Sequence, residues 1–321
     1  MKGLSSLYRG LSGVEPTAAD IGAVKKAGDT MTGALILSGS PTDPNQAATK
    51  SYVDSNSPSN PVTVPQGGTG LTTLTTAYGV VCAGTTANGS LQNAGAGTSG
   101  QYLKSNGASS LPSFASFKSP TVQKFTSGSG TYTTPAGVLY LRVRMTAGGG
   151  GGGGSGLTSG TGGTGGNSTF GTLLLTANGG VGGIFNAQGG SGGSPTVSSP
   201  AISILDIAGS NGGTGEQART FAFGGCGGSN PISGVAPMSN NIAGFSGKLG
   251  GGGGGGSGGA TAVITGSGGG AGAYIEAIIS SPSATYSYAV GSGGAGGTAG
   301  TSGFAGGAGG NGFIEITEYY N

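Results

Sequence analysis

One segment of the chain shows a long alternation of apolar and polar residues. Between 139 and 145 every second residue is apolar (Leu, Leu, Val, Met), and the residues between them are Tyr140, Arg142 and Arg144. This period of two is typical of a half-buried strand. Shorter apolar segments embedded in glycine predict further strands at 172–176, 202–207, 274–279, 286–290 and 313–319. The pattern therefore predicts a mainly β fold, a sheet or sandwich with glycine-rich connections.

Residues 1–55 predict only short elements. A strand is expected at 34–37 and a helix at 43–53, where Asp43 can cap the first amides and Pro44 suits the first helical position. A helix this short is marginal by itself, and none of these pieces could bury a core alone. Packing against copies of the same chain is the simplest remedy.

Residues 56–118 contain few large apolar side chains. Pro58, Pro61 and Pro65 precede a mixture of Thr, Gly, Ala and Ser, with strand fragments at 62–64 and 77–81. A monomeric domain of this size and composition would be poorly stabilised. We expect an extended, intertwined oligomer here, a β-rich shaft that leads to a third region at 119–321.

Glycine is abundant in the last region, and over part of it glycine recurs at every third residue. The chain holds 79 glycines, of which 59 follow residue 147, and every third residue from 291 to 312 is glycine. In a helix of three residues per turn, every third residue lies on one edge, and glycine there lets neighbouring backbones approach and exchange hydrogen bonds. Collagen shares the period but needs far more proline than this chain has. The spacing favours packed polyglycine-II helices; a flexible linker would explain the composition but not the period.

Composition and charge exclude several classes of function. Histidine is absent, so no Ser-His-Asp triad, Cys-His pair or histidine metal site can form. A net charge of +2 over 321 residues gives no footprint for nucleic acid. Cys82 and Cys226 cannot make a disulfide framework. No apolar segment approaches the length that spans a membrane, and no cofactor is expected.

Specific motifs occur in the first two regions. Residues 28–35 read Gly-Asp-Thr-Met-Thr-Gly-Ala-Leu, and Pro41 and the segment 47–54, Ala-Ala-Thr-Lys-Ser-Tyr-Val-Asp, follow them. Together with 18–24, these motifs resemble a repeat of bacteriophage tail fibres. The segments Gln-Gly-Gly-Thr-Gly at 66–70 and Gly-Gln-Tyr-Leu-Lys-Ser-Asn-Gly at 100–107 look like a shaft module of the same proteins.

The last region extends this resemblance. The segment from Phe125 through the glycine run 148–154, then 270–274, 290–294 and 312–316, is similar to the glycine-rich C-terminal domain of those fibres. The resemblance implies a homotrimeric virion fibre that attaches to the bacterial surface. It implies that 1–55 docks on another tail protein and trimerises, and that 56–118 is the shaft. Residues 119–321 would then be a receptor-binding tip with loops on a polyglycine scaffold. The receptor's chemistry stays open between an outer-membrane protein, lipopolysaccharide and a pilus.

Two segments of ordinary composition, 194–210 and 216–249, interrupt the glycine runs. Their Phe, Met, Arg and Asn residues suit a recognition surface, and loops on a rigid frame commonly carry binding. Arg219 and Lys248 are the only cations beyond residue 147, which favours an anionic sugar or an acidic protein loop as a contact. The alternative places the apolar members in the sandwich core. The candidate receptor-binding residues are Ile202, Leu205, Ile207, Arg219, Phe221, Phe223, Met238, Asn240, Asn241, Phe245 and Lys248.

Enzyme motifs fail on their context. Segments 189–193 and 255–259 match G-x-S-x-G, but without histidine neither can be a nucleophile elbow. The five acids of the last region, Asp206, Glu216, Glu276, Glu315 and Glu318, are expected to be solvated or paired. We therefore expect a binding protein rather than an enzyme. A purely structural virion connector or coat protein is the second reading, and a polysaccharide depolymerase that uses two of these acids is the third.

Overall fold

The computed structural model describes residues 39–44, 46–57, 62, 68, 76–84, 89–185, 188–217, 222–258 and 264–320. The chain divides into two compact units, Met1–Ser99 with Leu103–Phe114, and Gly100–Tyr102 with Ala115–Asn321. The predicted strand at 34–37 and the motifs at 18–24 and 28–35 lie outside the described residues. The described chain is mainly β with antiparallel sheets, which confirms the predicted class.

The described part of the chain before residue 117 contains one helix and two small hairpins. The helix is α2 (Lys50–Asn56), and the strands are β1 (Val81–Cys82), β2 (Gln92–Asn93), β3 (Gln101–Lys104) and β4 (Ser113–Ser116). β1 pairs only with β2, and β3 only with β4. No described residue before Tyr132 is buried, so these elements have no core within one chain.

Helix α2 starts later than predicted. Thr49, not Asp43, caps it, because the Thr49 side chain accepts the amide of Tyr52 at 3.0 Å. The predicted first turn folds instead as a separate turn, in which the Gln46 amide donates to the Asp43 carbonyl. The Gln46 side chain accepts the amide of Thr42 at 2.7 Å. This local side-chain contact competes with the helix and displaces its start.

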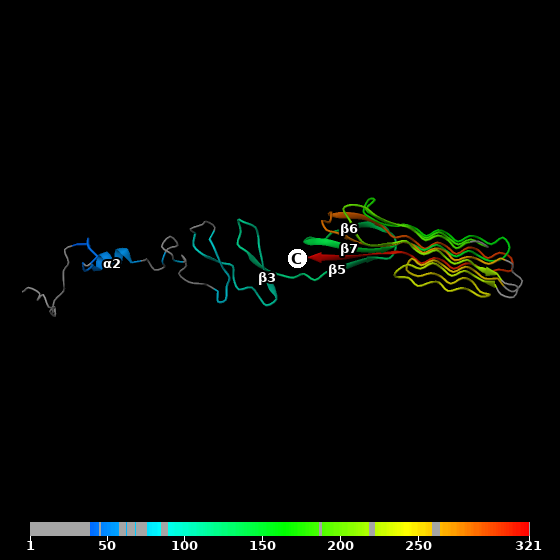
Figure 1. Ribbon diagram of the computed structural model, residues 1–321, viewed down its shortest axis with the longest axis horizontal. Helices are drawn as coiled ribbons and strands as arrows, with labels where there is room; N and C mark the ends of the chain where they lie inside the picture. The colour runs from blue at the N-terminus through cyan, green and yellow to red at the C-terminus, as the bar shows by residue number, and fades with distance from the viewer. Residues whose placement is uncertain are drawn as a thin grey trace, which may run out of the picture. The chain divides into compact units, whose positions relative to one another are not determined.

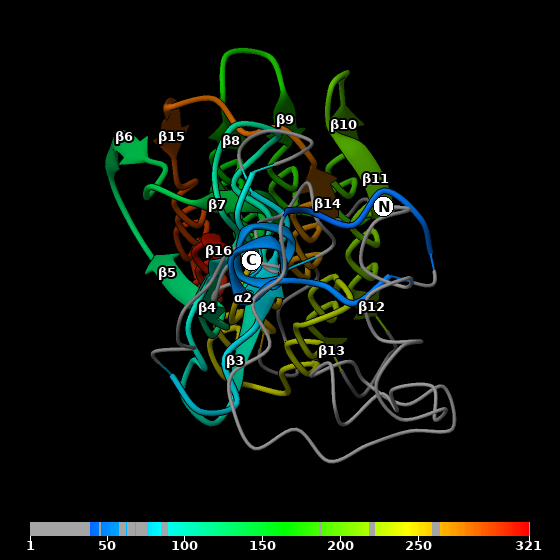
Figure 2. The ribbon, with the colours of Figure 1, turned by 90° about the vertical axis from the view of Figure 1, so that its left-hand side faces the viewer.

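The second unit is built on a sandwich of two five-stranded sheets (Figure 2). Sheet I has the order β10-β9-β8-β15-β6, and sheet II has the order β11-β14-β7-β16-β5. The strands of sheet I are β6 (Ser129–Thr133), β8 (Ser168–Phe170), β9 (Leu175–Ala177), β10 (Pro195–Val197) and β15 (Thr285–Ala289). Those of sheet II are β5 (Thr121–Phe125), β7 (Val138–Thr146), β11 (Ile202–Ile207), β14 (Tyr274–Ile279) and β16 (Phe313–Tyr320). A further hairpin joins β12 (Glu216–Gln217) to β13 (Ala222–Phe223).

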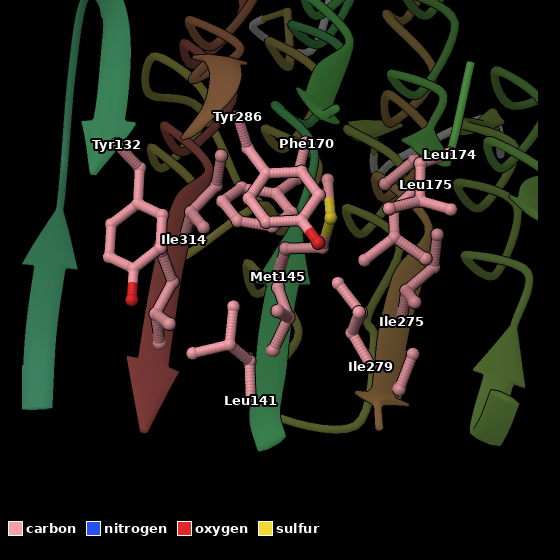
Figure 3. Packing of buried hydrophobic residues seen from close by; sticks show 14 of the residues in the cluster. Tyr132, Leu141, Met145, Phe170, Leu174, Leu175, Ile275, Ile279, Tyr286 and Ile314 are labelled. Carbon is pink, nitrogen blue, oxygen red and sulfur yellow. The ribbon is translucent and has the colours of Figure 1, made fainter. Parts of the chain in front are cut away.

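The alternation in β7 builds one side of the core. Leu141, Val143 and Met145 are fully buried, and they face aromatic rings of sheet I (Figure 3). Among these rings, Phe170 stacks on Tyr286 with centroids 4.8 Å apart. Neighbouring strands present the same face because residues two apart point the same way. The predicted strands at 139–145, 202–207, 274–279 and 313–319 all form, whereas 172–176 is a turn that only ends in β9.

Glycine-rich runs leave the ends of the strands side by side (Figure 1). We call them the glycine array, residues 147–166, 178–185, 188–194, 208–217, 222–258, 264–273 and 290–312. The central run, 148–156, is buried throughout. Its amides donate at 2.8–3.0 Å: residues 148, 151 and 154 to 160–166, residues 149, 152 and 155 to 303–312, and residues 150, 153 and 156 to 264–273.

The carbonyls of the central run repeat the same period. Residues 148 and 151 accept amides from 178–183, residues 149, 152 and 155 from 291–300, and residues 150 and 153 from 250–257. Three residues therefore bring the chain back to the same neighbour, and six runs surround the central one. The three runs that accept amides of the central run are antiparallel to it. The three runs that donate amides to it are parallel to it.

Close approach explains why glycine is required at these positions. A Cβ atom added at Gly152 would lie 2.0 Å from the carbonyl oxygen of Gly254, and one at Gly151 would lie 1.9 Å from that of Ala295. Real Cβ atoms do not approach backbone oxygens so closely, so no side chain fits. In an outer run the period of three appears as burial, with Gly291, Gly294 and Gly297 buried and the residue after each one exposed.

Candidate functional site

The reversals of the glycine array lie away from the sheets. The central run begins directly after β7 and reaches Leu157, where the chain turns back toward β8. Residues 157–159, 184–185, 240–242 and 301–302, here called the far turns, all lie at this end, the right-hand end of Figure 1. The turns at 230–235 and 248–250 lie at the opposite end, beside Thr146 of β7.

Left-handed residues shape three of the far turns. Thr158, Asn241 and Ser302 have φ angles of 60°, 54° and 59° although none of them is glycine. Such conformations are unfavourable, and they persist where the surrounding structure dictates them. The array supplies this constraint, since the hydrogen-bonded runs on both sides of each turn are held in place.

Backbone pairing also joins far turns from distant parts of the sequence. The Leu157 amide donates to the Thr301 carbonyl at 3.3 Å, and the Thr301 amide donates back at 2.9 Å. Isolated bridges join Phe185 to Gly266 and Phe223 to Asn240. The Leu157–Thr301 bridge therefore ties two far turns together, and the other two bridges tie a far turn to a neighbouring run or strand.

Three buried serines clamp the ends of neighbouring runs. Ser155, Ser257 and Ser267 each replace glycine in a buried run. Each serine donates its amide and its hydroxyl to the carbonyl of one partner and accepts that partner's amide at Oγ; the partners are Phe304, Ile242 and Ile184 respectively. These contacts pin two far turns, at Ile184 and Ile242, and the start of the return run at Phe304.

The far turns present apolar side chains to solvent. Leu157 is 62% exposed, and Ile184, Phe185 and Ile242 are each exposed by more than 40%. Amide and hydroxyl side chains lie among them, including the exposed Asn240 and Asn241. An apolar surface with polar groups on rigid turns is suited to binding another molecule.

The structure divides the predicted site residues among three places. Asn240 and Asn241 lie at the far turns, and Phe223 of β13 forms a bridge with Asn240. Met238, Phe245 and Lys248 are exposed along the side of the array, on the segments 235–239 and 243–248 that lead to and from the far turn at 240–242. Lys248 is at the end nearest the sheets. Ile202, Leu205 and Ile207 lie on β11 of the sandwich. Arg219 and Phe221 fall outside the described residues.

Strand β11 differs from both readings of its sequence. It is a strand, as the alternative reading expects, but its side chains are exposed and do not join the core. It is an edge strand of sheet II and pairs with β14 alone. The exposed residues Leu157, Ile184, Phe185 and Ile242 of the far turns were not among the predicted site residues. A break in the three-residue glycine phase at Leu157–Ser159 was the available signal.

Sheet II carries a charged network on its outer face. Arg142 Nε donates to Glu276 Oε1 at 2.7 Å, and the Tyr274 hydroxyl donates to Glu276 Oε2 at 3.0 Å. Arg144 pairs with Glu315 at 3.1 Å. Burial alone would raise the pKa of Glu276, but the hydrogen bonds from Arg142 and Tyr274 hold it below its ordinary value.

Glu318 lies on the inner face and is 2% exposed. It accepts hydrogen bonds from Thr121, from Gln123 at 2.6 Å, from Tyr132 at 2.9 Å and from Tyr320 at 3.1 Å. Burial favours the neutral acid, but these bonds, led by that from Thr121, lower the pKa of Glu318. The Glu318 contact with Tyr132 links the two sheets. Three of the five acids are thus paired or hydrogen-bonded, and Asp206 and Glu216 are exposed.

The described part of the chain holds no cluster of three or more acidic or cysteine side chains that could bind a metal ion. Nor does this part contain a helix with the length and apolar character needed to cross a membrane. Comparison of the chain with protein-family models, curated proteins and solved structures finds no match.

Proposed function

We propose that this chain is a bacteriophage tail-fibre protein that attaches the virion to the bacterial surface through the far turns. One observation carries the proposal: apolar and amide side chains gather on turns that a hydrogen-bonded array holds at the end away from the sandwich. Binding is more favourable when the binding surface is preorganised, because less conformational entropy is lost. The resemblance of its motifs to tail fibres gives this surface a biological role.

The runs of the glycine array are polyglycine-II helices in this proposal. The return to the same neighbour after three residues, six neighbours around the central run and the glycines at most of the contacts support this assignment. Such an array is a rigid support whose neighbouring runs are held by backbone hydrogen bonds. It carries turns without needing a large apolar core.

The proposed fibre is a homotrimer whose N-terminal region, 1–55, docks on another tail protein. The absence of buried residues in the described chain before Tyr132 supports association of copies, because an uncovered hairpin is marginally stable. Three tips on one fibre, and several fibres on one virion, would strengthen attachment by avidity. The receptor is a protein, lipopolysaccharide or pilus on the host.

A panel of bacterial strains tests the proposal. The full-length chain, fluorescently labelled and shown to be folded, is incubated with the strains, and binding is measured by flow cytometry. Strain-selective, saturable binding that unlabelled protein displaces is the expected result. Binding to no strain, together with binding to other tail proteins, would assign the chain to a structural connector. Release of reducing ends from host polysaccharide would assign it to a depolymerase.

A further inference from the structure

The outer faces of the two sheets differ in chemistry. Most outward residues of sheet I carry hydroxyl groups and are half-buried or exposed; among them are Thr131, Thr133, Thr169, Thr176, Thr196, Thr285 and Ser287. A surface of this composition is stable in water without a cover. The outer face of sheet II instead combines charged side chains with exposed apolar ones.

Sheet II presents apolar side chains on its outer face at the β11 edge. The register places Ile202 beside Ile278, Leu205 beside Glu276 and Ile207 beside Tyr274. Ile202 is 58% exposed, and Leu205 and Ile207 are also exposed. Exposed edge strands with apolar side chains are commonly covered in native assemblies, since they otherwise promote aggregation.

A row of alternating charge crosses the same face. From β14 to β5 the register aligns Glu276, Arg144, Glu315 and Lys124. The acids and bases of this row balance, so two such faces can meet without strong repulsion. A face of a single sign would exclude contact between identical chains, and this face does not.

An ordered turn of the glycine array borders this face. The Asn230 side chain donates to Thr146 Oγ1 at 3.0 Å and to the Leu249 carbonyl at 3.2 Å. The Leu249 carbonyl is held by this contact. The Leu249 side chain is 47% exposed and adds an apolar group beside the end of β7 that leads into the glycine array. The turn at 248–250 therefore places a second exposed apolar residue at the border of this face.

We propose that the outer face of sheet II is the surface on which a second copy of this chain packs. The N-terminal part indicates the occupant, because its described residues have no core within one chain and need association. Copies joined there hold their sandwiches at high effective concentration, which favours packing of this face, with its mixed charges and exposed apolar residues, against a neighbouring copy. The inference rests on the self-association that the proposed fibre requires and names its surface in the second unit.

Photocrosslinking of the full chain tests this surface. p-Benzoylphenylalanine replaces Leu205 in one variant and Thr196, exposed on sheet I, in a matched control. Light scattering gives the mass of each, and irradiation is followed by denaturing electrophoresis. The expected result is covalent dimers from position 205 and background from position 196. Adding Ile202→Lys to the position-205 variant should reduce the dimers, with the thermal transition unchanged.

Each other outcome overturns the inference in a distinct way. A multimer that crosslinks equally from both positions, or from neither, associates through another surface, and the proposed fibre then survives without this interface. A crosslink from position 205 to the chain's own N-terminal region would assign the face to an intramolecular partner. A monomeric mass would contradict both the interface and the trimeric fibre.

Discussion

Ser267 and Ile184 are joined by three hydrogen bonds. The Ser267 amide donates to the Ile184 carbonyl at 2.9 Å, the Ser267 hydroxyl donates to the same oxygen at 2.6 Å, and the Ile184 amide donates to Ser267 Oγ at 2.8 Å. Because Ser267 is fully buried and Ile184 is exposed, this clamp fixes the far turn at 184–185 to the interior of the array. Rigidity of the far turns therefore depends on single hydroxyl groups.

Replacement of Ser267 by alanine should destabilise the second unit by about 2 kcal/mol, because the fully buried Ser267 loses the hydroxyl that bonds both the amide and the carbonyl of Ile184. The chain with Ser292→Ala, an exposed serine of an outer run, is the control and should change by less than about 0.5 kcal/mol. Chemical denaturation measures both. Equal effects of the two substitutions would show that the clamp has no special role.

Replacement of Gly294 by valine should disrupt the array, since a Cβ atom there would lie 2.0 Å from the Gly163 carbonyl oxygen. The expected loss is on the order of 3 kcal/mol or more, seen as a lower melting temperature or as insoluble protein. Ala295 is exposed in the same run, and Ala295→Val should be tolerated. If Gly294→Val melts at the wild-type temperature, the close packing of the runs is wrong.

Asn230 should be important for joining the array to sheet II. Its side chain donates to Thr146 and Leu249 and accepts the amides of Ile232 and Ser233. We expect Asn230→Ala to cost about 2–3 kcal/mol, because several buried groups lose partners. Asn211→Ala, which removes one exposed contact with Gly192, should cost less than about 1 kcal/mol. Urea titration of the two variants measures the difference, and similar midpoints would refute this role.

Stability should fall in acid partly through Glu318. Its pKa is lowered in the folded state, so its contribution is present above the unfolded value of 4.5 and is lost as the pH falls through the folded value. Glu318→Gln removes the hydrogen bonds to the charged carboxylate, a loss of about 2 kcal/mol at pH 7. The melting temperatures of wild type and variant should differ at pH 7 and converge below pH 4.5. A constant difference across this range would contradict the assignment.

Regular patterns made part of the fold predictable. Strands β7, β11, β14 and β16 follow from apolar runs or alternation, and the three-residue glycine period indicates backbone contacts between runs. Strands such as β6 and β8 were missed because their residues are mostly Ser, Thr and Gly, which carry little apolar periodicity. Their position is set by pairing with β15, a contact distant in sequence.

The candidate site was less predictable. Composition grouped 194–210 with 216–249, but the chain places β11 on the sandwich and Asn240 and Asn241 at the far turns. The direction of each run decides which turn lies at which end, and that direction follows from the order of neighbours in the array. The break in the glycine phase at Leu157–Ser159 indicates a turn, but no nearby residue shows at which end of the array that turn lies.

The affinity of the chain for a bacterial strain to which it binds tests the role of the far turns most directly. The full chain, the variant Leu157→Ser/Phe185→Ser/Ile242→Ser and the control Leu139→Ser/Leu173→Ser are titrated onto cells of that strain. All substituted residues are exposed, and the control pair lies on the sandwich. We predict at least a ~10-fold weaker Kd for the far-turn variant, from loss of apolar contacts, and an unchanged Kd for the control. An unchanged Kd for the far-turn variant would contradict attachment through the far turns.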